Sequence, residues 1–443
     1  MYKLVKNNKG QKLWKKACEI IPGGNGLLSK RPERYSPDLW PIYFSKAKGC
    51  FIWDLEGNKF IDMAQNGIGS AILGYADSDV DKAVLNSIKT GVNTTLNPPE
   101  EYELAKYLLK INPGMSQVKF ARGGGEAMSV AIRIARANSK YDKVLFSGYH
   151  GWNDWYIAAN VSKRSNLDDH LIPGLNPIGV PDALRNSAIP FIYNDCEDFL
   201  KKLKIHKNIA AVVIEGARYY GPNKEFIKLI EKETKKRNIS FIVDDITSGF
   251  RIGPSGTYIN YGYKPDMVVY GKALGNGYAI SAIVGTEKAM SISSETFISS
   301  TMWTEKVGFS AALACLKKLN NEKVYKHLVS TGKNIGLIWN NVAKKYNVDI
   351  AVSDFYPLVT FKFKYPEIEN KLLTLFIQEM LRRGFLASNS IYVTYAHNSA
   401  ILKKYEKACD DVFYILRKSI IGSNFDSYLK TKLRYDSFAR LNK

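Results

Sequence analysis

The chain has 443 residues, 45% of them apolar and 24% charged, a composition that excludes a chain disordered over its whole length. Its longest apolar runs, such as residues 209–214, are much shorter than the roughly 20 residues of a membrane-spanning helix, so we expect no such helix and no membrane partner. The formal net charge of +21 favours an anionic small molecule, whereas the even spread of lysine along the chain argues against a nucleic-acid partner.

Three further features predict a cytoplasmic protein without a metal site. The first 16 residues are basic, but no apolar stretch of the kind found in signal peptides follows them. The five cysteines are scattered and never form a C-x-x-C pair, which indicates neither a disulfide framework nor a zinc site. None of the five histidines is spaced to share a metal ion with another.

The N-terminal part of the chain predicts a loop followed by a β-hairpin. Residues 22–37 are rich in turn-forming residues, and we expect them to form an ordered loop or arm. Residues 49–62 contain two strand-like runs around a Glu-Gly-Asn turn at residues 56–58, a pattern typical of a hairpin.

Residues 117–284 predict the central sheet. Short β-branched runs alternate there with helical patterns, an order that is typical of a mostly parallel sheet covered by helices. The expected strands are residues 144–146, 190–193, 210–214, 240–243 and 267–270.

The C-terminal part, after residue 309, has an α+β pattern that begins with a predicted helix over residues 309–319. We expect the two ends of the chain to form a smaller domain together. The predicted regions are residues 1–65 (an arm and part of the small domain), 66–315 (the large domain) and 316–443 (the rest of the small domain).

Polar residues stand at the ends of three of the expected strands. Glu215 and Asp244 directly follow apolar runs, and Lys272 comes soon after a third run. Ligands of open α/β sheets bind beyond the carboxyl ends of the strands, so these positions offer acids and an amine to one crevice. Taken alone, an Asp or Lys at a strand end is more often a helix cap or a solvated side chain than a functional residue.

Two glycine-containing turns in the same region are candidate binding elements. Gly123, Gly124 and Gly125 lie between a strand-like run and a helical pattern, where backbone N–H groups and the helix dipole favour a phosphate. The turn lacks the Lys-Ser/Thr ending of a P-loop, and glycines also serve tight packing. In the second turn, Tyr149 could stack on a planar ring or simply pack in the turn, and His150 is equally ambiguous.

A phosphate cradle, a flat aromatic side chain, a carboxylate and an amine are together what a pyridoxal-phosphate site requires. Residues 244–251 (DDITSGFR) resemble the D-E-V-x-T-G-F-R signature of class III aminotransferases, and residues 270–277 (YGKALGNG) are similar to their cofactor-lysine segment. The turns at 149–151 and 123–127 and the hairpin at 53–62 also match the pattern of that family. Within the class, residues 22–24, 72–74 and 378–384 resemble glutamate-1-semialdehyde 2,1-aminomutases and their relatives.

The resemblance implies a fold-type I transferase with a mostly parallel seven-stranded sheet, pyridoxal 5'-phosphate as cofactor, and a homodimer with shared active sites. It implies that Lys272 binds the cofactor as a Schiff base and moves the substrate proton, that Asp244 pairs with the pyridine nitrogen, and that Tyr149 stacks on the ring. The remaining cofactor contacts that it implies are Gly124, Gly125, Glu215 and, from the neighbouring subunit, Thr301.

The chain also departs from the family pattern. Arg122 stands where the family usually has Asn, beside a glycine turn without the family's hydroxyl, and could compensate for it. The carboxylate-binding arginine of the aminomutase arm is replaced or shifted, which leaves Lys30 or Arg31 as substitutes. Residues 301–306 depart from T-x-x-G-N-P, which makes Trp303 part of an altered substrate wall, and we count His150 among the candidate substrate contacts.

These features favour an aminotransferase that moves an amino group from an amino-acid donor to an aldehyde or ketone. The alternatives are a 2,1-aminomutase of the glutamate-1-semialdehyde type and a non-catalytic binding protein that kept the fold. The ending at residues 435–442 resembles a subgroup associated with bacterial surface-carbohydrate pathways, which suggests a place for the reaction.

Overall fold

The computed structural model describes residues 4–170, 174–422 and 424–435. The chain divides into two compact units, one formed by Met1–Asp77 with His327–Lys443 and the other by Ser78–Lys326. The boundaries between the units follow residues 77 and 326, and the boundaries predicted from the sequence follow residues 65 and 315. No helix among the described residues is long and apolar enough to cross a membrane. The C-terminal residues 436–442, on which the surface-carbohydrate resemblance mostly depends, lie outside the described residues.

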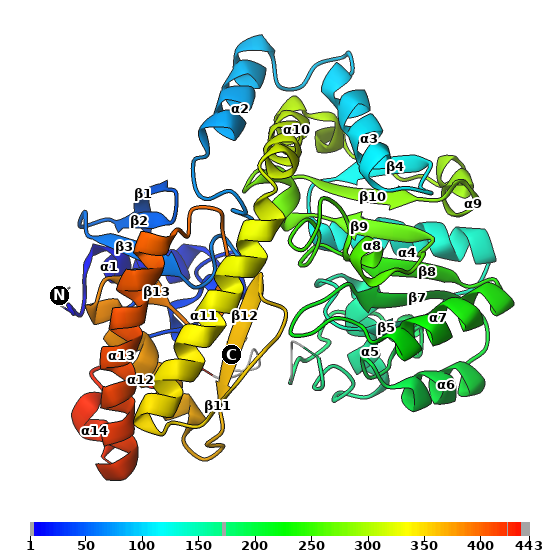
Figure 1. The fold of residues 1–443 in the computed structure, drawn as a ribbon. Coiled ribbons are helices and arrows are strands. Elements are labelled where there is room, and N and C mark those ends of the chain that lie inside the picture. The colour runs from blue at the N-terminus through cyan, green and yellow to red at the C-terminus, as the bar shows by residue number, and fades with distance from the viewer. Residues whose placement is uncertain (1–3, 171–173, 423, 436–443) are drawn as a thin grey trace. The chain divides into compact units, whose positions relative to one another are not determined.

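The second unit is built on a seven-stranded sheet of order β4-β10-β9-β8-β7-β5-β6, most of which can be followed in Figure 1. Strands β9, β8, β7, β5 and β6 are parallel, and β10 is antiparallel to both of its neighbours. The predicted mostly parallel sheet is therefore confirmed. The strands are β4 (Gln117–Ala121), β5 (Lys143–Ser147), β6 (Ala188–Pro190), β7 (Ile209–Glu215), β8 (Ser240–Asp244), β9 (Met267–Tyr270) and β10 (Ser281–Gly285).

The strand expected at residues 190–193 is wrong in its bounds, because β6 ends at Pro190. The apolar residues after Pro190 predict a longer strand, but Phe191 is buried in the loop that follows β6. Its N–H still donates to the carbonyl of Phe146 at 2.9 Å, so one contact to β5 continues beyond the strand.

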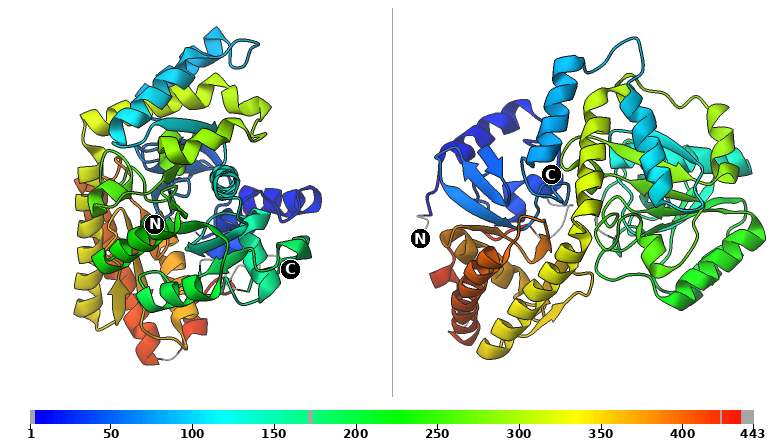
Figure 2. Two further views of the ribbon diagram at one scale, coloured as in Figure 1. Left: turned by 90° about the vertical axis from the view of Figure 1, so that its right-hand side faces the viewer. Right: turned by 45° about the horizontal axis from the view of Figure 1, so that its top comes forward.

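Helices of this unit cover the sheet and form a small helical group beside it. Helix α4 packs against β4, β7, β8, β9 and β10, and α7 packs against β8 and α6. Helix α10 contacts both α2 and α3, and the right-hand view of Figure 2 shows it between them. The longer helices are α2 (Ser78–Thr90), α3 (Pro99–Ile111), α4 (Gly124–Ser139), α5 (Asp154–Ser162), α6 (Cys196–Ile205), α7 (Lys224–Arg237) and α10 (Lys306–Asn321). The predicted helix over 309–319 is thus confirmed within α10.

The unit also contains short helical elements. They are the helices α8 (Thr257–Tyr261) and α9 (Glu287–Met290) and the 3-10 helices η3 (Asp182–Leu184), η4 (Lys272–Gly275), η5 (Ser291–Ser294) and η6 (Thr301–Thr304).

The central strands are buried at every position, which explains their unbroken apolar sequences. All residues of β7, β8, β9 and β10 are buried, as expected for strands with covered faces. An ionisable residue in such a strand needs a partner, because an unpaired buried charge is strongly destabilised. Glu215 and Asp244 are the last residues of β7 and β8, so the burial of these ends sets the chemistry of the site.

The first unit contains two smaller sheets and four long helices. The predicted hairpin is confirmed, since β2 and β3 pair in antiparallel fashion. The sheets have the orders β1-β2-β3-β13 and β11-β12-β14. Their strands are β1 (Phe44–Lys48), β2 (Phe51–Asp54), β3 (Lys59–Met63), β11 (Ile350–Val352), β12 (Leu358–Phe363), β13 (Phe385–Ala387) and β14 (Ser390–Tyr392). The helices are α1 (Lys9–Ile20), η1 (Leu28–Lys30), η2 (Pro32–Arg34), α11 (Val324–Tyr346), α12 (Glu369–Arg382), α13 (Ser399–Gly422) and α14 (Phe425–Tyr428).

Candidate active site

The parallel register of the sheet brings the predicted acids together. Glu215 and Asp244 are direct neighbours across β7 and β8, and both are buried. Lys272 begins η4, two residues after the end of the adjacent strand β9. The three residues therefore lie at the same carboxyl edge of the sheet, as the sequence predicted.

Asp244 is held by a buried histidine. Its Oδ2 lies 2.8 Å from Nδ1 of His150, and its Oδ1 accepts the N–H of Ile246 at 3.1 Å. The other ring nitrogen of His150 is 3.2 Å from the carbonyl oxygen of Ser147, so both nitrogens face oxygen acceptors. With a proton on Nδ1, the ring donates to the carboxylate of Asp244 and stabilises its negative charge. This position supports a role for His150 in holding Asp244 and offers none in direct contact with a substrate.

A second histidine supports the same turn. The N–H of Gly148 points at Nδ1 of His170 at a distance of 3.3 Å. Burial, and then the nearby His150, lower the pKa of His170 to about 4. His170 is therefore neutral at physiological pH and keeps a lone pair for this hydrogen bond.

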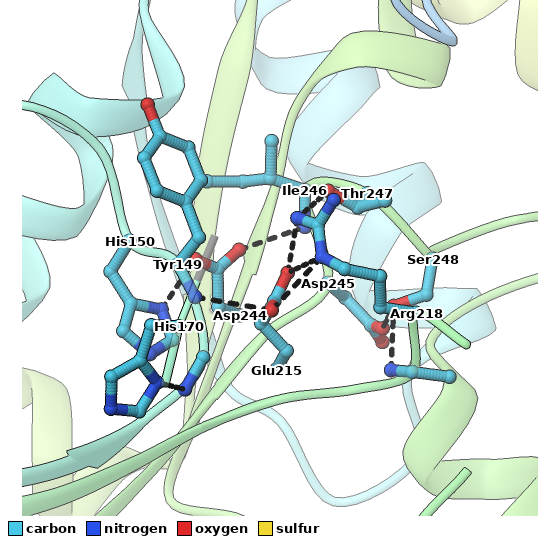
Figure 3. A network of polar contacts seen from close by, with 12 residues as sticks. Tyr149, His150, His170, Glu215, Arg218, Asp244, Asp245, Ile246, Thr247 and Ser248 are labelled. Carbon is cyan, nitrogen blue, oxygen red and sulfur yellow. Dashed lines mark hydrogen bonds and ion pairs between the residues drawn. The ribbon is translucent and has the colours of Figure 1, made fainter. Parts of the chain in front are cut away.

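Glu215 is held by a forked ion pair. Nε and a terminal nitrogen of Arg218 donate to its carboxylate at 2.9 and 2.5 Å, and the N–H of Tyr149 donates to it at 3.1 Å. Burial acts to raise the pKa of Glu215, but Arg218 and these hydrogen bonds outweigh it and lower the pKa. Figure 3 shows the carboxylates of Asp244 and Glu215 between His150 on one side and Arg218 on the other.

The turn after β5 must be made of glycine where it passes Glu215. Gly148 has a φ of +111°, and a Cβ there would lie 2.5 Å from Cγ of Glu215. This close approach places Tyr149 beside the carboxylates. Burial raises the pKa of Tyr149, so its phenol stays neutral and its ring can stack on an aromatic ligand.

Lys272 lies in a strained backbone position beside a hydroxyl. Its φ is +40°, which is unfavourable for a residue with a side chain and is a feature of functional sites. Its Nζ donates to Oγ1 of Thr247 at 2.7 Å. The same hydroxyl accepts from a terminal nitrogen of Arg218 at 3.3 Å, so the amine and the ion pair meet at Thr247.

A third carboxyl, on Asp245, fixes the loop that carries Thr247. It accepts hydrogen bonds from Ser248 Oγ and from both the N–H and the Oγ1 of Thr257, each at 2.7 Å. Burial raises the pKa of Asp245 to about 6. A Cβ at Gly216 would overlap with Asp245 and Thr257, which explains why glycine replaces the proline of the family's I-E-P segment here.

The glycine turn before α4 has the geometry of a phosphate cradle. Helix α4 begins at Gly124, so the N–H groups of Gly124 and Gly125 belong to its first turn and have no acceptor within the helix. The N–H of Gly123 is instead taken by Glu126 at 3.2 Å. Cβ atoms would lie 2.9 Å from Ile246 at Gly124 and 2.6 Å from Asn153 at Gly125. The turn therefore favours glycine at both positions, because a larger residue would have to displace Ile246 or Asn153.

Ile246 is a site residue that the sequence reasoning missed. Its side chain lies near enough to Gly124 and Gly271 that a Cβ at either would contact it, at 2.9 and 3.3 Å respectively. It thus packs between the glycine turn and the segment of Lys272. Its position two residues after Asp244, in the DDI motif, is the signal that could have identified it.

Arg122 holds the segment that contains Thr301 and Trp303. Its guanidinium donates to the carbonyls of Met302 and Glu305, each at 2.7 Å, and of Trp303 at 3.1 Å, and it lies 3.3 Å from the carboxylate of Glu305. Burial lowers its pKa. These contacts give Arg122 a positioning role, and its contact with a phosphate or substrate stays a prediction. Thr301 itself is exposed, and Trp303 is half-buried.

Lys30 and Arg31 belong to the other unit of the chain. Lys30 ends η1, and Nε of Arg31 lies 3.6 Å from the carboxylate of Glu33. Their contact with a substrate stays a prediction.

The strand-end acids, the strained lysine and the glycine cradle define a pyridoxal-phosphate-dependent enzyme of fold type I. The model of the class-III aminotransferases matches residues 34–387, and the chain belongs to this family. A 3-aminobutyryl-CoA aminotransferase of Cloacimonas acidaminovorans is 28% identical over 90% of this chain and 94% of its own. A glutamate-1-semialdehyde 2,1-aminomutase of Nitrosopumilus maritimus is 31% identical over 77% of this chain and 80% of its own.

A solved structure has the same fold. The FumI protein of Sphingopyxis sp. MTA144, with bound cofactor, is 22% identical, covers 96% of this chain and 99% of its own, and has a TM-score of 0.84. The predicted family, fold type and cofactor are confirmed by these comparisons.

Proposed function

We propose that this class III enzyme is an intermolecular aminotransferase, which takes an amino group from an amino-acid donor and delivers it to an aldehyde or ketone. The observation that carries the proposal is the meeting of Lys272, Asp244 and Tyr149 at one edge of the sheet, each held by a buried partner. A binding protein without activity would not need a strained, half-buried lysine at this place.

Each residue has a distinct task in the proposed reaction. When bound, pyridoxal phosphate supplies a ring that withdraws electrons from the substrate carbon. Lys272 would hold the cofactor through Nζ, and the same nitrogen would move the substrate proton. Asp244, with its charge stabilised by His150, holds a proton on the pyridine nitrogen. Tyr149 and Ile246 enclose the ring.

The phosphate is proposed to bind at the start of α4. The N–H groups of Gly124 and Gly125 would donate to it, and the helix dipole adds to its stabilisation. Glu215, fixed by Arg218, orients Tyr149 through its backbone N–H.

A second candidate is the internal transfer made by 2,1-aminomutases. Its support is the 31% identity with the aminomutase of Nitrosopumilus maritimus. We favour the transaminase because the carboxylate-binding arginine of the aminomutase arm and the T-x-x-G-N-P wall are both altered in this chain.

The acceptor is proposed to be a carbonyl on a precursor of a surface carbohydrate. One relative, the 2'-deamino-2'-hydroxyneamine transaminase of Streptomyces kanamyceticus, is 27% identical over 90% of this chain. Directly after Arg218, Tyr219 and Tyr220 expose 44% and 49% of their surface, and aromatic faces of this kind pack well on sugar rings. The cytoplasmic location stays a prediction.

The enzyme is proposed to act as a homodimer. Large apolar side chains are unusually exposed around the glycine cradle and the segment of Thr301: Leu96 (80%), Trp152 (75%), Phe297 (87%) and Met302 (55%). Exposed apolar groups of this size indicate a covered surface in the assembled protein. A second copy of the chain would cover them and bring its own Thr301 to the phosphate.

The proposed reaction is tested by two half-reactions of the purified holoenzyme. L-Glutamate or L-alanine should remove the visible absorption band of the bound cofactor, and a carbonyl acceptor should restore it. Sedimentation of the same sample should give a dimer. A band that responds to glutamate-1-semialdehyde alone would support the aminomutase, and a band that responds to no amine would contradict both reactions.

A further inference from the structure

Thr247 lies between the Lys272 amine and the ion pair of Glu215 and Arg218. The proposed cofactor contacts do not explain this link. Its Oγ1 accepts from Nζ of Lys272 at 2.7 Å and from a terminal nitrogen of Arg218 at 3.3 Å. The two cationic nitrogens are therefore no more than 6.0 Å apart, the sum of the two contacts. Arg218 is at the same time in a forked contact with Glu215, and the side chains of this pair are only 13% and 9% exposed.

The loop holds Thr247 firmly in this place. The carbonyl of Thr247 accepts from Nε of the fully buried Arg251 at 2.6 Å, and Asp245 fixes the same loop through Ser248 and Thr257. The position of the hydroxyl is thus set by the fold and does not depend on a ligand.

The charges around Lys272 come from three strand ends and from the loop after β8. They are Glu215 and Arg218 after β7, Asp244, Asp245 and Arg251 at and after β8, and the titratable Tyr149 and His150 after β5. Asp244 is paired with His150, and Asp245 is surrounded by hydroxyl and N–H donors. Among these contacts, the Glu215–Arg218 pair is the one that shares a hydrogen-bonded atom, Oγ1 of Thr247, with the Lys272 amine.

We propose that Glu215, Arg218 and Thr247 are positioning residues that set the protonation of the Lys272 nitrogen. With both charges present, the pair is neutral and the nitrogen keeps its proton near neutral pH. If Glu215 loses its charge, Arg218 is left uncompensated and opposes that proton. If Arg218 loses its charge, Glu215 is left uncompensated and favours the proton.

This inference rests on the proposed link between Lys272 and the cofactor, and it predicts two opposite shifts. The readout is a pH titration of the visible band of the holoenzyme, without any substrate. Glu215→Gln keeps the oxygen that accepts from Tyr149 and should move the transition about one to two pH units lower, as expected for a unit charge at this separation in a partly buried site. Arg218→Met should move it to higher pH by a similar amount, and Arg218→Lys, which keeps the charge, should move it much less.

A matched control is available in the same unit. Asp182 and Arg185 form an ion pair with the same three-residue spacing, but their side chains are 84% and 49% exposed. Asp182→Asn removes the same charge as Glu215→Gln and should leave the transition where it is in the natural protein.

The hydroxyl is tested by a second pair of variants. Thr247→Val removes the acceptor of the Lys272 nitrogen at nearly constant shape and should lower the pH of the transition and kcat, with a smaller change in KM. Thr247→Ser should restore both.

The outcomes separate this inference from the proposed function. Shifts of Glu215→Gln and Arg218→Met in the same direction, or no larger than that of Asp182→Asn, would overturn the inference while the transaminase stands. If Arg218→Met does not fold, the Glu215→Gln and Asp182→Asn comparison still decides. If the natural protein has no visible band with added cofactor, the assignment of Lys272 itself is wrong.

Discussion

Two parts of the same unit of the chain are built in different ways. One is the floor of the site, formed by Glu215, Asp244, Asp245 and Lys272, and the other is the segment around Thr301. At the floor, each acid has partners within the site: Asp244 has His150, Glu215 has Arg218, and Asp245 has Ser248 and Thr257. Around Thr301, the backbone is tied by Arg122, but the large side chains of Phe297 and Met302 are exposed.

In the proposed dimer, this difference separates the part of the site that one chain completes from the part that a second copy covers. The partners of the floor come from neighbouring strand ends, so the fold alone fixes their geometry. The segment around Thr301 has hydrogen bonds within the chain, but its large apolar side chains are exposed. This is expected for a surface that a second copy of the chain would cover. Substitutions of Lys272, Asp244, Asp245 and Arg122 test this difference directly.

Lys272→Ala tests the centre of the floor. It should remove the visible band and reduce kcat/KM by at least about 10³-fold, because general acid–base catalysis by the amine is lost. Absorption and steady-state kinetics measure the two effects. Lys264→Ala, at an exposed lysine of the same unit, is the control and should change neither. Retained turnover in Lys272→Ala would show that another amine does the work.

Asp244→Asn tests the charge under the ring. It should reduce kcat/KM by about 10²- to 10³-fold, since the oriented charge that keeps the ring protonated disappears. His150→Gln should have a smaller effect, about 10- to 100-fold, because it acts only through Asp244. Equal losses in the two variants would mean that His150 has a task of its own.

Asp245→Asn tests the buried loop of the floor through stability. Burial raises the folded-state pKa of Asp245 to about 6 from an ordinary 3.8, so folding favours the protonated carboxyl. The stabilisation linked to this proton is complete below pH 3.8 and is lost as the pH rises to about 6. Relative to the variant, the natural protein should lose roughly 3 kcal/mol of unfolding free energy over this window. Urea unfolding from pH 4 to 7 measures it, and a constant difference between the two proteins would refute it.

Arg122→Gln tests the wall. It should free the segment at residues 301–305 and cost about 1 to 3 kcal/mol of stability, because three carbonyls lose a donor. Thermal unfolding gives the stability, and sedimentation at decreasing concentration should show a weaker dimer. Arg185→Gln, at an exposed arginine, is the control. A dimer of unchanged strength would separate the wall from the subunit contact.

The sequence could predict the fold and the residue types of the site because both depend on local order. Alternating strands and helices predict a parallel sheet, and polar residues at strand ends must meet at one edge. The end of β6 was predicted too late in the chain because Phe191 is apolar. It is buried in a loop, and sequence alone does not distinguish a buried loop residue from a buried strand residue.

Side-chain partners could not be predicted, because they depend on direction in space. Nothing in the sequence shows that His150 points at Asp244, or that Arg122 donates to the carbonyls of residues 302, 303 and 305. The packing of Ile246 between two glycines is equally a matter of the folded loop. These are the residues for which the structure changed the interpretation.

The most direct test of the account is to find the lysine that bears the cofactor. Reduction of the holoenzyme with borohydride makes the link permanent, and peptide mass spectrometry then locates it. The account predicts one modified site, in the peptide that contains Lys272. A modification on any other lysine, or none in a protein that has bound the cofactor, would contradict it.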